Sequence, residues 1–312
     1  MPKRHESVLE KEILQYLNLK EDSLIVDGTL GDGGHTELIL KNTGPDLRVF
    51  GIDRDMQAIK RAKERLAPFR NRVTLVHGNF SDIKTILKKA GIVNVDGLLL
   101  DLGVSSPQLD SPERGFSFMR NGPLDMRMDS MQKTTAADLL VKLSDEELTS
   151  VIKEYGEERY SKRIVRAIRK AQGQKPVSTT LDLSDIISSV TLSSRPTKIH
   201  PATRTFQALR IVVNNELEHI KTALSDSLEI LRGSARIMVI SFHSLEDRIV
   251  KNFFQSEEKG CICPPKIPIC ACGHKPRLKI VTRRPIAPAV EEVRRNSRAS
   301  SAKLRVAERV YV

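Results

Sequence analysis

The chain has 312 residues, of which 39% are hydrophobic and 29% charged, so it is long enough for about two domains with buried cores. This composition excludes a wholly disordered chain, and because no apolar run reaches about 18–20 residues we expect neither a membrane span nor a membrane partner. The N-terminal residues lack the apolar stretch of a secretory signal, and the four cysteines are few and late in the chain. We therefore expect a cytoplasmic protein without a disulfide framework.

The charge of the chain is strongly basic and unevenly distributed. Lys and Arg number 51 against 39 Asp and Glu, for a net charge of +12. Residues 275–312 contain eleven basic and three acidic residues, and residues 159–175 contain seven basic residues and no acidic one. Two such patches predict contact with nucleic-acid phosphates, with a merely solvated basic surface as the alternative. Since only 4% of residues are aromatic, stacking on many successive bases is not the expected mode of binding.

Four short apolar segments in the first hundred residues read as strands. They cover residues 23–26, 47–52, 73–76 and 95–100, and helix-length segments separate them. The fourth is almost entirely apolar, as a strand covered on both faces should be. The alternation predicts an α/β fold with a doubly wound, mostly parallel sheet.

A long helical region then interrupts the strands. Ser144 and Glu147 form a capping box, and apolar residues follow at helical spacing on this and later segments, including a long stripe from Phe206 to Leu231. The next strand signal is at residues 235–241, and segments 279–282 and 304–306 could complete the sheet edge. We therefore predict one domain from residues 1–111 and 216–312, with an all-α domain, residues 112–215, inserted into it.

The first strand continues into a glycine-rich turn with the sequence DGTLGDGGH at residues 27–35. Glycines allow a sharp turn and close approach of a ligand to the backbone. Asp53 ends the second strand twenty residues after Gly33, where a carboxylate can accept both hydroxyls of a ribose. The pair predicts a site for an adenosine-type cofactor, with a purely structural turn as the alternative.

The same turn differs from a dinucleotide-binding fingerprint. Thr36 stands in place of the third glycine, and Asp27 and Asp32 would repel a pyrophosphate. These carboxylates suit a cationic ligand such as S-adenosylmethionine, and the pattern resembles motif I of the class I methyltransferases. A nicotinamide-dependent oxidoreductase is the weaker alternative.

The segment after the fourth strand, DLGVSSPQLD at residues 101–110, lies where class I methyltransferases carry their catalytic loop. An exocyclic amine on a base is a poor nucleophile, and acceptors for its N–H groups can aim its lone pair at the methyl group. Asp101, Ser106 and the Pro107 carbonyl are the candidate acceptors. In the usual motif of amino-methylating enzymes, a second proline and an aromatic residue follow. Here Gln108 replaces the second proline and no aromatic residue follows. Phe116 or Phe118 would then stack on the base, with packing in the core as the alternative role for either.

Several long motifs together resemble the RsmH (MraW) family, among them GTLGDGGHT, DLGVSSPQLD, HPATRTFQALRIVVNNEL and SFHSLEDRIVK. The resemblance covers residues 5–309. It implies a class I methyltransferase fold with a helical insert, S-adenosylmethionine as cofactor, and methylation of N4 of a cytidine in the 16S ribosomal RNA of the 30S subunit or its assembly intermediate. The implied cofactor contacts are Gly33, Gly34, His35, Asp53, Phe80, Asp101 and Gln108.

Polar residues within the family motifs that flank the insert are candidates for holding the RNA and the target base. For each, local ion pairing, as between Asp125 and Arg127, is the alternative. His243, after the fifth strand, lies near the expected pocket, although a structural histidine is the more common case. The candidate substrate contacts are Arg114, Arg127, Arg204, Gln207 and Arg210.

The four cysteines are grouped as two C-x-C pairs, Cys261 with Cys263 and Cys270 with Cys272. Four thiolates can hold a tetrahedral zinc ion, which here would be structural, but the usual signature is paired C-x-x-C. We therefore assign no metal ligand, with free thiols in a surface loop as the alternative to zinc. A homodimer and a non-catalytic RNA-binding assembly factor also remain open.

Overall fold

The computed structural model describes residues 7–18, 20–191, 200–261, 263 and 272–311. Contacts within the chain divide it into two compact units. The first combines Met1–Gly103 with Leu217–Val312, and the second is Val104–Glu216. Among the described residues, no helix combines the length and apolar character needed to cross a membrane.

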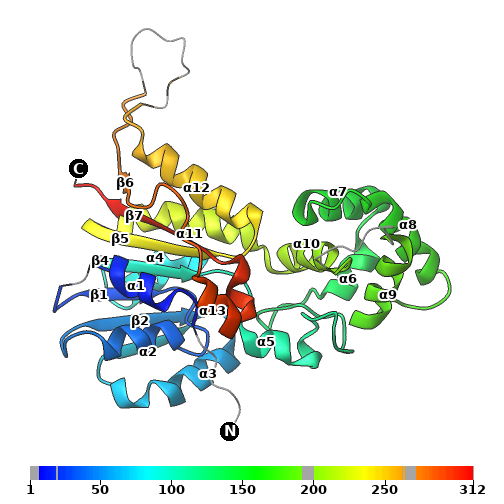
Figure 1. Cartoon of the computed structure of the whole chain (residues 1–312), viewed down its shortest axis with the longest axis horizontal. Coiled ribbons are helices and arrows are strands. Elements are labelled where there is room, and N and C mark those ends of the chain that lie inside the picture. Colours follow the sequence, from blue (N-terminus) through cyan, green and yellow to red (C-terminus); the bar gives the residue numbers. More distant parts are fainter. Residues whose placement is uncertain (1–6, 19, 192–199, 262, 264–271, 312) are drawn as a thin grey trace. The chain divides into compact units, whose positions relative to one another are not determined.

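The first unit is built on a seven-stranded sheet in the order β3-β2-β1-β4-β5-β7-β6 (Figure 1). The first five strands in this order are parallel, whereas β7 runs antiparallel to both β5 and β6. The strands are β1 (Leu24–Asp27), β2 (Arg48–Asp53), β3 (Val73–His77), β4 (Val95–Asp101), β5 (Leu231–Ser241), β6 (Leu278–Ile280) and β7 (Lys303–Arg309).

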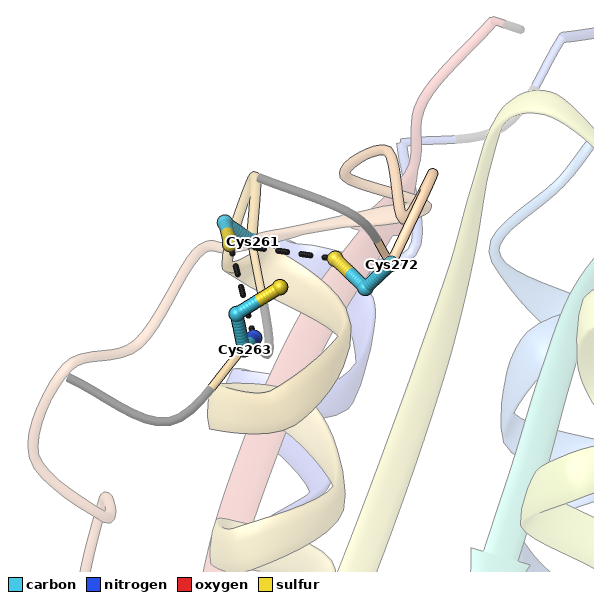
Figure 2. Close-up of side chains that lie close together, drawn as sticks. All are labelled: Cys261, Cys263 and Cys272. Carbon is cyan, nitrogen blue, oxygen red and sulfur yellow. Dashed lines mark hydrogen bonds between the residues drawn. The ribbon is translucent and has the colours of Figure 1, made fainter. Parts of the chain in front are cut away.

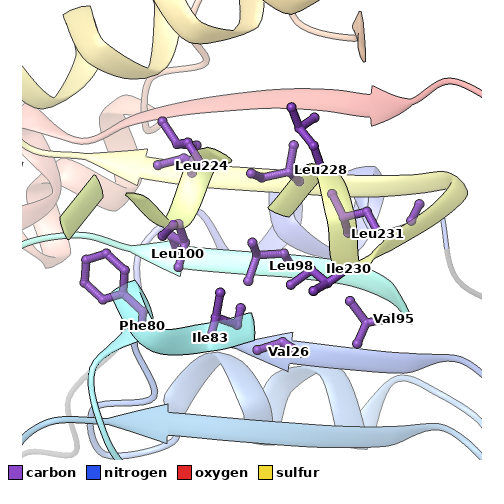
Figure 3. Close-up of a cluster of buried hydrophobic side chains, with 14 of the residues drawn as sticks. Val26, Phe80, Ile83, Val95, Leu98, Leu100, Leu224, Leu228, Ile230 and Leu231 are labelled. Atoms are coloured by element: carbon purple, nitrogen blue, oxygen red, sulfur yellow. The ribbon is translucent and has the colours of Figure 1, made fainter. Parts of the chain in front are cut away.

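Helices cover both faces of this sheet. Buried side chains of α4, α11 and α12 form one hydrophobic cluster with one face (Figure 3), and those of α1, α2 and α3 form a second cluster with the other. The helices of this unit are α1 (Glu10–Tyr16), α2 (Gly34–Lys41), α3 (Met56–Arg65), α4 (Ile83–Lys89), α11 (Glu216–Ile230), α12 (Ser244–Glu258) and α13 (Val290–Arg295). Short 3-10 turns are η1 (Ala67–Phe69), η2 (Phe80–Asp82) and η4 (Ser297–Ser301).

The pattern of β4 shows why these residues form a central strand. Leu98 and Leu100 point into the first cluster, and Leu99 points into the second. Successive side chains of a strand point to opposite faces, so a strand covered on both faces must be apolar throughout. The sequence therefore makes β4 suitable only for the middle of a sandwiched sheet, and the predicted doubly wound α/β fold is confirmed.

Two details of the predicted elements are corrected by the structure. The apolar stripe from Phe206 to Leu231 is not continuous, because Asn215 adopts a left-handed conformation with φ of 49° and separates α10 (Thr203–Asn214) from α11. Leu231 belongs to β5, which begins four residues before the predicted start at Ala235. The extra residues pair irregularly with β4, where the register shifts between Val95 and Gly97.

The second unit is helical around a hydrophobic cluster of its own. Ser144 accepts the N–H of Glu147 at 3.2 Å and the Glu147 carboxylate accepts the Ser144 N–H at 2.8 Å, so the predicted capping box is present. The elements of this unit are α5 (Ser106–Asp110), η3 (Pro112–Arg114), α6 (Ala136–Lys142), α7 (Asp145–Gly156), α8 (Ser161–Gln172), α9 (Thr180–Thr191) and α10.

The second unit begins at Val104, eight residues before the boundary that we predicted at residue 112. The physical reason is packing, since Val104 and Leu109 lie against the hydrophobic cluster of the second unit. Helix α5 therefore belongs with the helical unit and not with the sheet. Phe116 is buried in the same cluster, which favours the core role that we weighed against base stacking.

Candidate active site

Three carboxyl groups end three adjacent parallel strands. Asp27, Asp53 and Asp101 are the last residues of β1, β2 and β4. Because β1 pairs with β2 on one side and with β4 on the other, these carboxyl groups lie at one edge of the sheet. This is the edge at which doubly wound sheets bind their ligands.

The glycine-rich turn follows β1 and leads into α2. Gly33 caps α2 with φ of 76°, and a Cβ there would also lie only 2.9 Å from the Leu66 side chain. A Cβ on Gly34 would lie 2.2 Å from the Ser7 hydroxyl. Gly33 is therefore required by its backbone conformation and by close packing, and Gly34 by close packing alone, whatever ligand the turn accepts.

The Asp53 carboxylate is held in a fixed orientation by the backbone. Its Oδ2 accepts the N–H of Gly31 at 2.7 Å and its Oδ1 accepts the N–H of Asp55 at 2.8 Å. Burial raises the pKa of Asp53 to about 6, against the lowering effect of these two hydrogen bonds. Each oxygen has a second lone pair, so the group can still accept a pair of hydroxyls.

The other two acidic residues of the turn are occupied by partners within the protein. Asp27 accepts the Thr36 hydroxyl at 2.7 Å, and burial raises its pKa. Asp32 forms an ion pair with Arg61 at 2.8 Å. The structure therefore corrects our expectation that Asp27 and Asp32 supply the negative charge for a cationic ligand.

Asp101 is the third carboxyl group at this edge of the sheet. Its Oδ2 lies 3.6 Å from Nδ1 of His35, whose Nε2 is 2.8 Å from the carbonyl oxygen of Val8. Its Oδ1 is buried and has no hydrogen-bond partner among the described residues. Burial raises the pKa of Asp101 to about 6, His35 lowers it, and the nearby Asp27 raises it further. A buried carboxylate oxygen without a partner is costly, which marks Asp101 as a place for a ligand group.

Two further residues of the first unit have structural contacts. Phe80, a predicted cofactor contact, is 9% exposed and packs at the end of the first hydrophobic cluster beside Leu100 (Figure 3), with its ring edge-on to His219. His243 caps α12, where its Nδ1 accepts the N–H of Glu246 at 3.4 Å. This capping contact is the kind that a structural histidine makes, while the buried Nε2 of His243, 3.2 Å from Oε1 of Glu246, has no hydrogen-bond partner among the described residues.

In the second unit, the predicted catalytic loop forms the start of a helix. Ser106 and Pro107 are the first two residues of α5, and Ser105 caps it. The side-chain oxygen of Gln108 accepts the N–H of Ser105 at 3.0 Å, and the Pro107 carbonyl accepts the N–H of Ser111 at 3.0 Å. Gln108 and the Pro107 carbonyl therefore have roles in building α5, besides the cofactor and substrate roles that we predict for them.

Two of the five predicted substrate contacts brace a loop of the second unit. Arg114 donates to the carbonyls of Arg127 and Met128 at 3.0 and 2.9 Å. Arg127 forms a two-bond ion pair with Asp125, at 2.8 and 2.7 Å, which raises the pKa of Arg127. The Arg127 contact matches the local ion pairing that we weighed as the alternative to RNA binding, whereas Arg114 binds backbone carbonyls.

The other three predicted contacts lie on α10 and differ in exposure. Arg210 forms a two-bond ion pair with the buried carboxylate of Glu216 at 2.8 Å, and Gln207 donates to the Tyr155 carbonyl at 2.9 Å. Arg204 is 46% exposed and lies 3.9 Å from Glu158. Of the five, Arg204 alone has an exposed side chain.

The sequence analysis missed Asn214, which is fully buried at the end of α10. Its amide oxygen accepts the N–H of Met128 at 2.8 Å, and its amide nitrogen donates to the Met126 carbonyl at 2.8 Å. Asn214 thereby fixes the loop that carries Arg127. The available signal was a polar residue within an otherwise apolar helical stripe.

The sheet order and the glycine-rich turn opposite Asp53 define a class I methyltransferase fold. Comparison with known proteins narrows this class: the model of the MraW methylase family matches residues 2–310, and the chain belongs to that family. Two curated relatives are both named ribosomal RNA small subunit methyltransferase H. The protein from Carboxydothermus hydrogenoformans is 50% identical over 98% of each chain, and that from Halothermothrix orenii is 51% identical over 98% of each chain.

Proposed function

We propose that the protein transfers a methyl group from S-adenosylmethionine to N4 of a cytidine in 16S ribosomal RNA. The observation that carries this proposal is the buried, unpartnered Oδ1 of Asp101 beside the turn that Asp53 closes. The names of the relatives support the small-subunit RNA as the substrate, and the proposed place of action is the cytoplasm, on the 30S subunit or its assembly intermediate.

The residues at the strand ends fit S-adenosylmethionine. The Asp53 carboxylate is oriented by two backbone N–H groups and keeps a lone pair on each oxygen for the ribose hydroxyls. Asp101 offers a negative charge for a cationic group, and His35 lies against its other oxygen. When bound, the cofactor supplies an electrophilic methyl group on a positively charged sulfur.

The reaction also needs acceptors for the N–H groups of the target amine, since these direct its lone pair toward the methyl carbon. Asp101, Ser106 and Pro107 follow one another closely in the sequence, and we assign this task to the Asp101 carboxylate, the Ser106 hydroxyl and the free lone pair of the Pro107 carbonyl. Attack of the amine on the methyl group would form an N–C bond in place of the S–C bond and would make the amine acidic. Asp101, with a pKa of about 6, then takes up the released proton.

We propose that exposed basic residues bind the RNA. Six of the seven cations between residues 159 and 175 are exposed, as are eight of the eleven between residues 275 and 312. Their contacts with phosphates would supply affinity without reading sequence. The target base must leave its stack, at a cost of a few kcal/mol, so a loop or junction nucleotide is the natural substrate.

The test is incubation of the protein with methyl-labelled S-adenosylmethionine and 30S particles that lack the modification, followed by nucleoside analysis. We expect label on N4-methylated cytidine. Asp101→Asn should slow transfer about 10²- to 10⁴-fold, as expected for loss of a group that takes a proton, whereas the exposed Asp46→Asn should leave the rate unchanged. Label on a ring carbon, a ribose oxygen or protein would contradict the amine assignment, and no label would favour the non-catalytic assembly factor.

A further inference from the structure

Three cysteines gather in the segment between α12 and β6, outside the proposed active site. The sulfur atoms of Cys261, Cys263 and Cys272 all lie within 4.8 Å of one another (Figure 2). Cys270, the fourth cysteine of the sequence, lies outside the described residues. The cluster forms beyond the C-terminal end of α12, and Cys261 and Cys272 meet although ten residues separate them in the chain.

The spacing of the sulfur atoms matches a shared metal ion. The Sγ atoms of Cys261 and Cys272 are 3.7 Å apart. Two thiolates on a tetrahedral zinc ion, each bound at about 2.3 Å, are separated by about 3.8 Å, whereas bonded disulfide sulfurs are only about 2.05 Å apart. In addition, the N–H of Cys263 donates to Sγ of Cys261 at 3.4 Å, which stabilises negative charge on that sulfur.

The described residues on either side of the cysteines have few buried contacts. The base of the segment is closed by Arg277, which donates two hydrogen bonds to the Glu257 carboxylate at 2.5 and 2.8 Å and one from its backbone N–H to the Glu257 carbonyl at 2.8 Å. Beyond this base, none of the described residues between Lys259 and Pro276 is buried. Since these described residues bury no side chain, a metal ion bound by thiolates from both ends of the segment can supply a cross-link between them.

We propose that Cys261, Cys263 and Cys272 bind one zinc ion as thiolates, with a fourth donor completing the tetrahedron, and that the ion fixes the segment between α12 and β6. Sulfur ligands in a tetrahedral arrangement select zinc over the hard cations. On binding, each thiol releases its proton to solvent. The inference departs from the sequence analysis, which assigned no metal ligand because it looked for C-x-x-C pairs, whereas the structure pairs Cys261 with Cys272 across the segment.

The test is the zinc content of the full-length protein after washing with a chelator, measured by mass spectrometry of the metal. We expect one zinc per chain in the wild type and its loss in Cys261→Ser, Cys263→Ser and Cys272→Ser. Lys259→Ser is the matched control, because it changes an exposed, non-thiol side chain of the same segment, and it should keep its zinc. Far-UV circular dichroism shows whether each variant keeps its helices.

Cobalt substitution gives a second readout that does not depend on activity. Cobalt bound to the protein should show the intense thiolate-to-cobalt absorption of a tetrahedral sulfur site, reduced in each Cys→Ser variant and intact in Lys259→Ser. The proposal is overturned if the wild type holds no more zinc than the triple Cys→Ser variant. It is equally overturned if Cys261 and Cys272 are recovered from reductant-free preparations as a disulfide.

Discussion

The three aspartates at the ends of β1, β2 and β4 have the same side chain and different tasks. Asp27 is satisfied by Thr36, Asp53 is oriented by two backbone N–H groups, and Asp101 keeps a buried oxygen without a partner. The neighbouring groups determine which carboxylate can bind a ligand, because a carboxylate whose oxygens already accept hydrogen bonds within the protein gains little from a ligand. The contacts of each residue therefore separate roles that the sequence treats alike.

Replacing Asp53 should weaken cofactor binding. In Asp53→Asn, an N–H₂ group replaces one of the two carboxylate oxygens. The backbone N–H of either Gly31 or Asp55 then faces this donor without an acceptor, and one acceptor for the ribose hydroxyls is lost. Hydrogen bonds to charged groups are worth about 1.5–3 kcal/mol, so the Kd for S-adenosylmethionine should rise about 10- to 100-fold by calorimetry. Asp32→Asn, which removes only the ion pair with Arg61, is the control and should bind almost normally. Equal losses in the two variants would contradict the assigned role of Asp53.

The raised pKa of Asp101 predicts a pH dependence of cofactor binding. With a pKa of about 6, this carboxyl is mostly neutral at pH 5 and mostly ionised at pH 7, and only the ionised form attracts a sulfonium. Affinity for S-adenosylmethionine should therefore rise with pH through about 6, by up to about tenfold. S-adenosylhomocysteine has no positive sulfur, so its affinity should change less.

The ratio of the affinity for S-adenosylmethionine to that for S-adenosylhomocysteine isolates the effect of Asp101. Asp53 also has a pKa of about 6, but its proposed contact is the ribose that both ligands share, so its effect on the two affinities cancels in the ratio. In Asp101→Asn the ratio should no longer vary with pH. A ratio that stays constant in the wild type would show that the sulfonium does not lie beside Asp101.

At the scale of elements, α8 has a buried apolar face and an exposed basic face. Ile164, Val165 and Ile168 are buried in the core of the second unit, and Arg169 is tied to Asp145 at 2.6 Å and to the Leu143 carbonyl at 2.5 Å. The other basic residues of the helix point to solvent and form no ion pair with any described acidic residue; they are Lys162, Arg163, Arg166 and Lys170. Helical spacing separates a packing face from a cationic face, which suits contact with phosphates.

Neutralising this cationic face should lower both the affinity for RNA and its dependence on salt. Each lost phosphate contact reduces the slope of log K against log salt by about 0.9. Arg163→Gln combined with Arg166→Gln should therefore reduce the slope for 30S particles by about 2, measured by filter binding across salt concentrations. Lys153→Gln, an exposed change on α7, should leave the slope unaltered. An unaltered slope in the double variant would remove α8 from the RNA interface.

At the scale of the whole molecule, the chain leaves the sheet after β4 and returns to it after α10, with a separate hydrophobic cluster formed between. The two units therefore have separate cores, and a ligand of one need not stabilise the other. Because all the cofactor contacts that we place at the strand ends lie in the first unit, the units should respond differently to the cofactor.

Hydrogen exchange followed by mass spectrometry can measure this difference. S-adenosylmethionine should slow exchange of backbone amides in the turn at residues 28–36 and around Asp53, since binding stabilises the liganded state. Amides of α7, α8 and α9 should exchange at the same rate with and without it. Protection of those helices instead would place the cofactor elsewhere.

Much of the fold follows from local patterns. The apolar run of β4, the capping box at Ser144 and the glycines of the turn each specify one local structure, and the structure confirms all three. The break at Asn215 and the early start of β5 could not be predicted, because both depend on how distant segments pair and pack. The same limit applied to Arg210, whose ion pair with Glu216 was not predicted, whereas the ion pair of Arg127 with the nearby Asp125 was already the alternative that the sequence offered.

The sequence by itself therefore determined the class of fold, the order of its elements and which functional groups stand at each strand end. It could do so because hydrophobic periodicity and turn residues specify structure through residues close together in the chain. Only the tertiary structure decided which of these groups are already occupied. It pairs Asp32 with Arg61, leaves an oxygen of Asp101 unpartnered, and brings Cys261 to Cys272. Hydrogen bonds and metal bonds form over a few ångströms of space, and sequence distance does not fix which groups come that close.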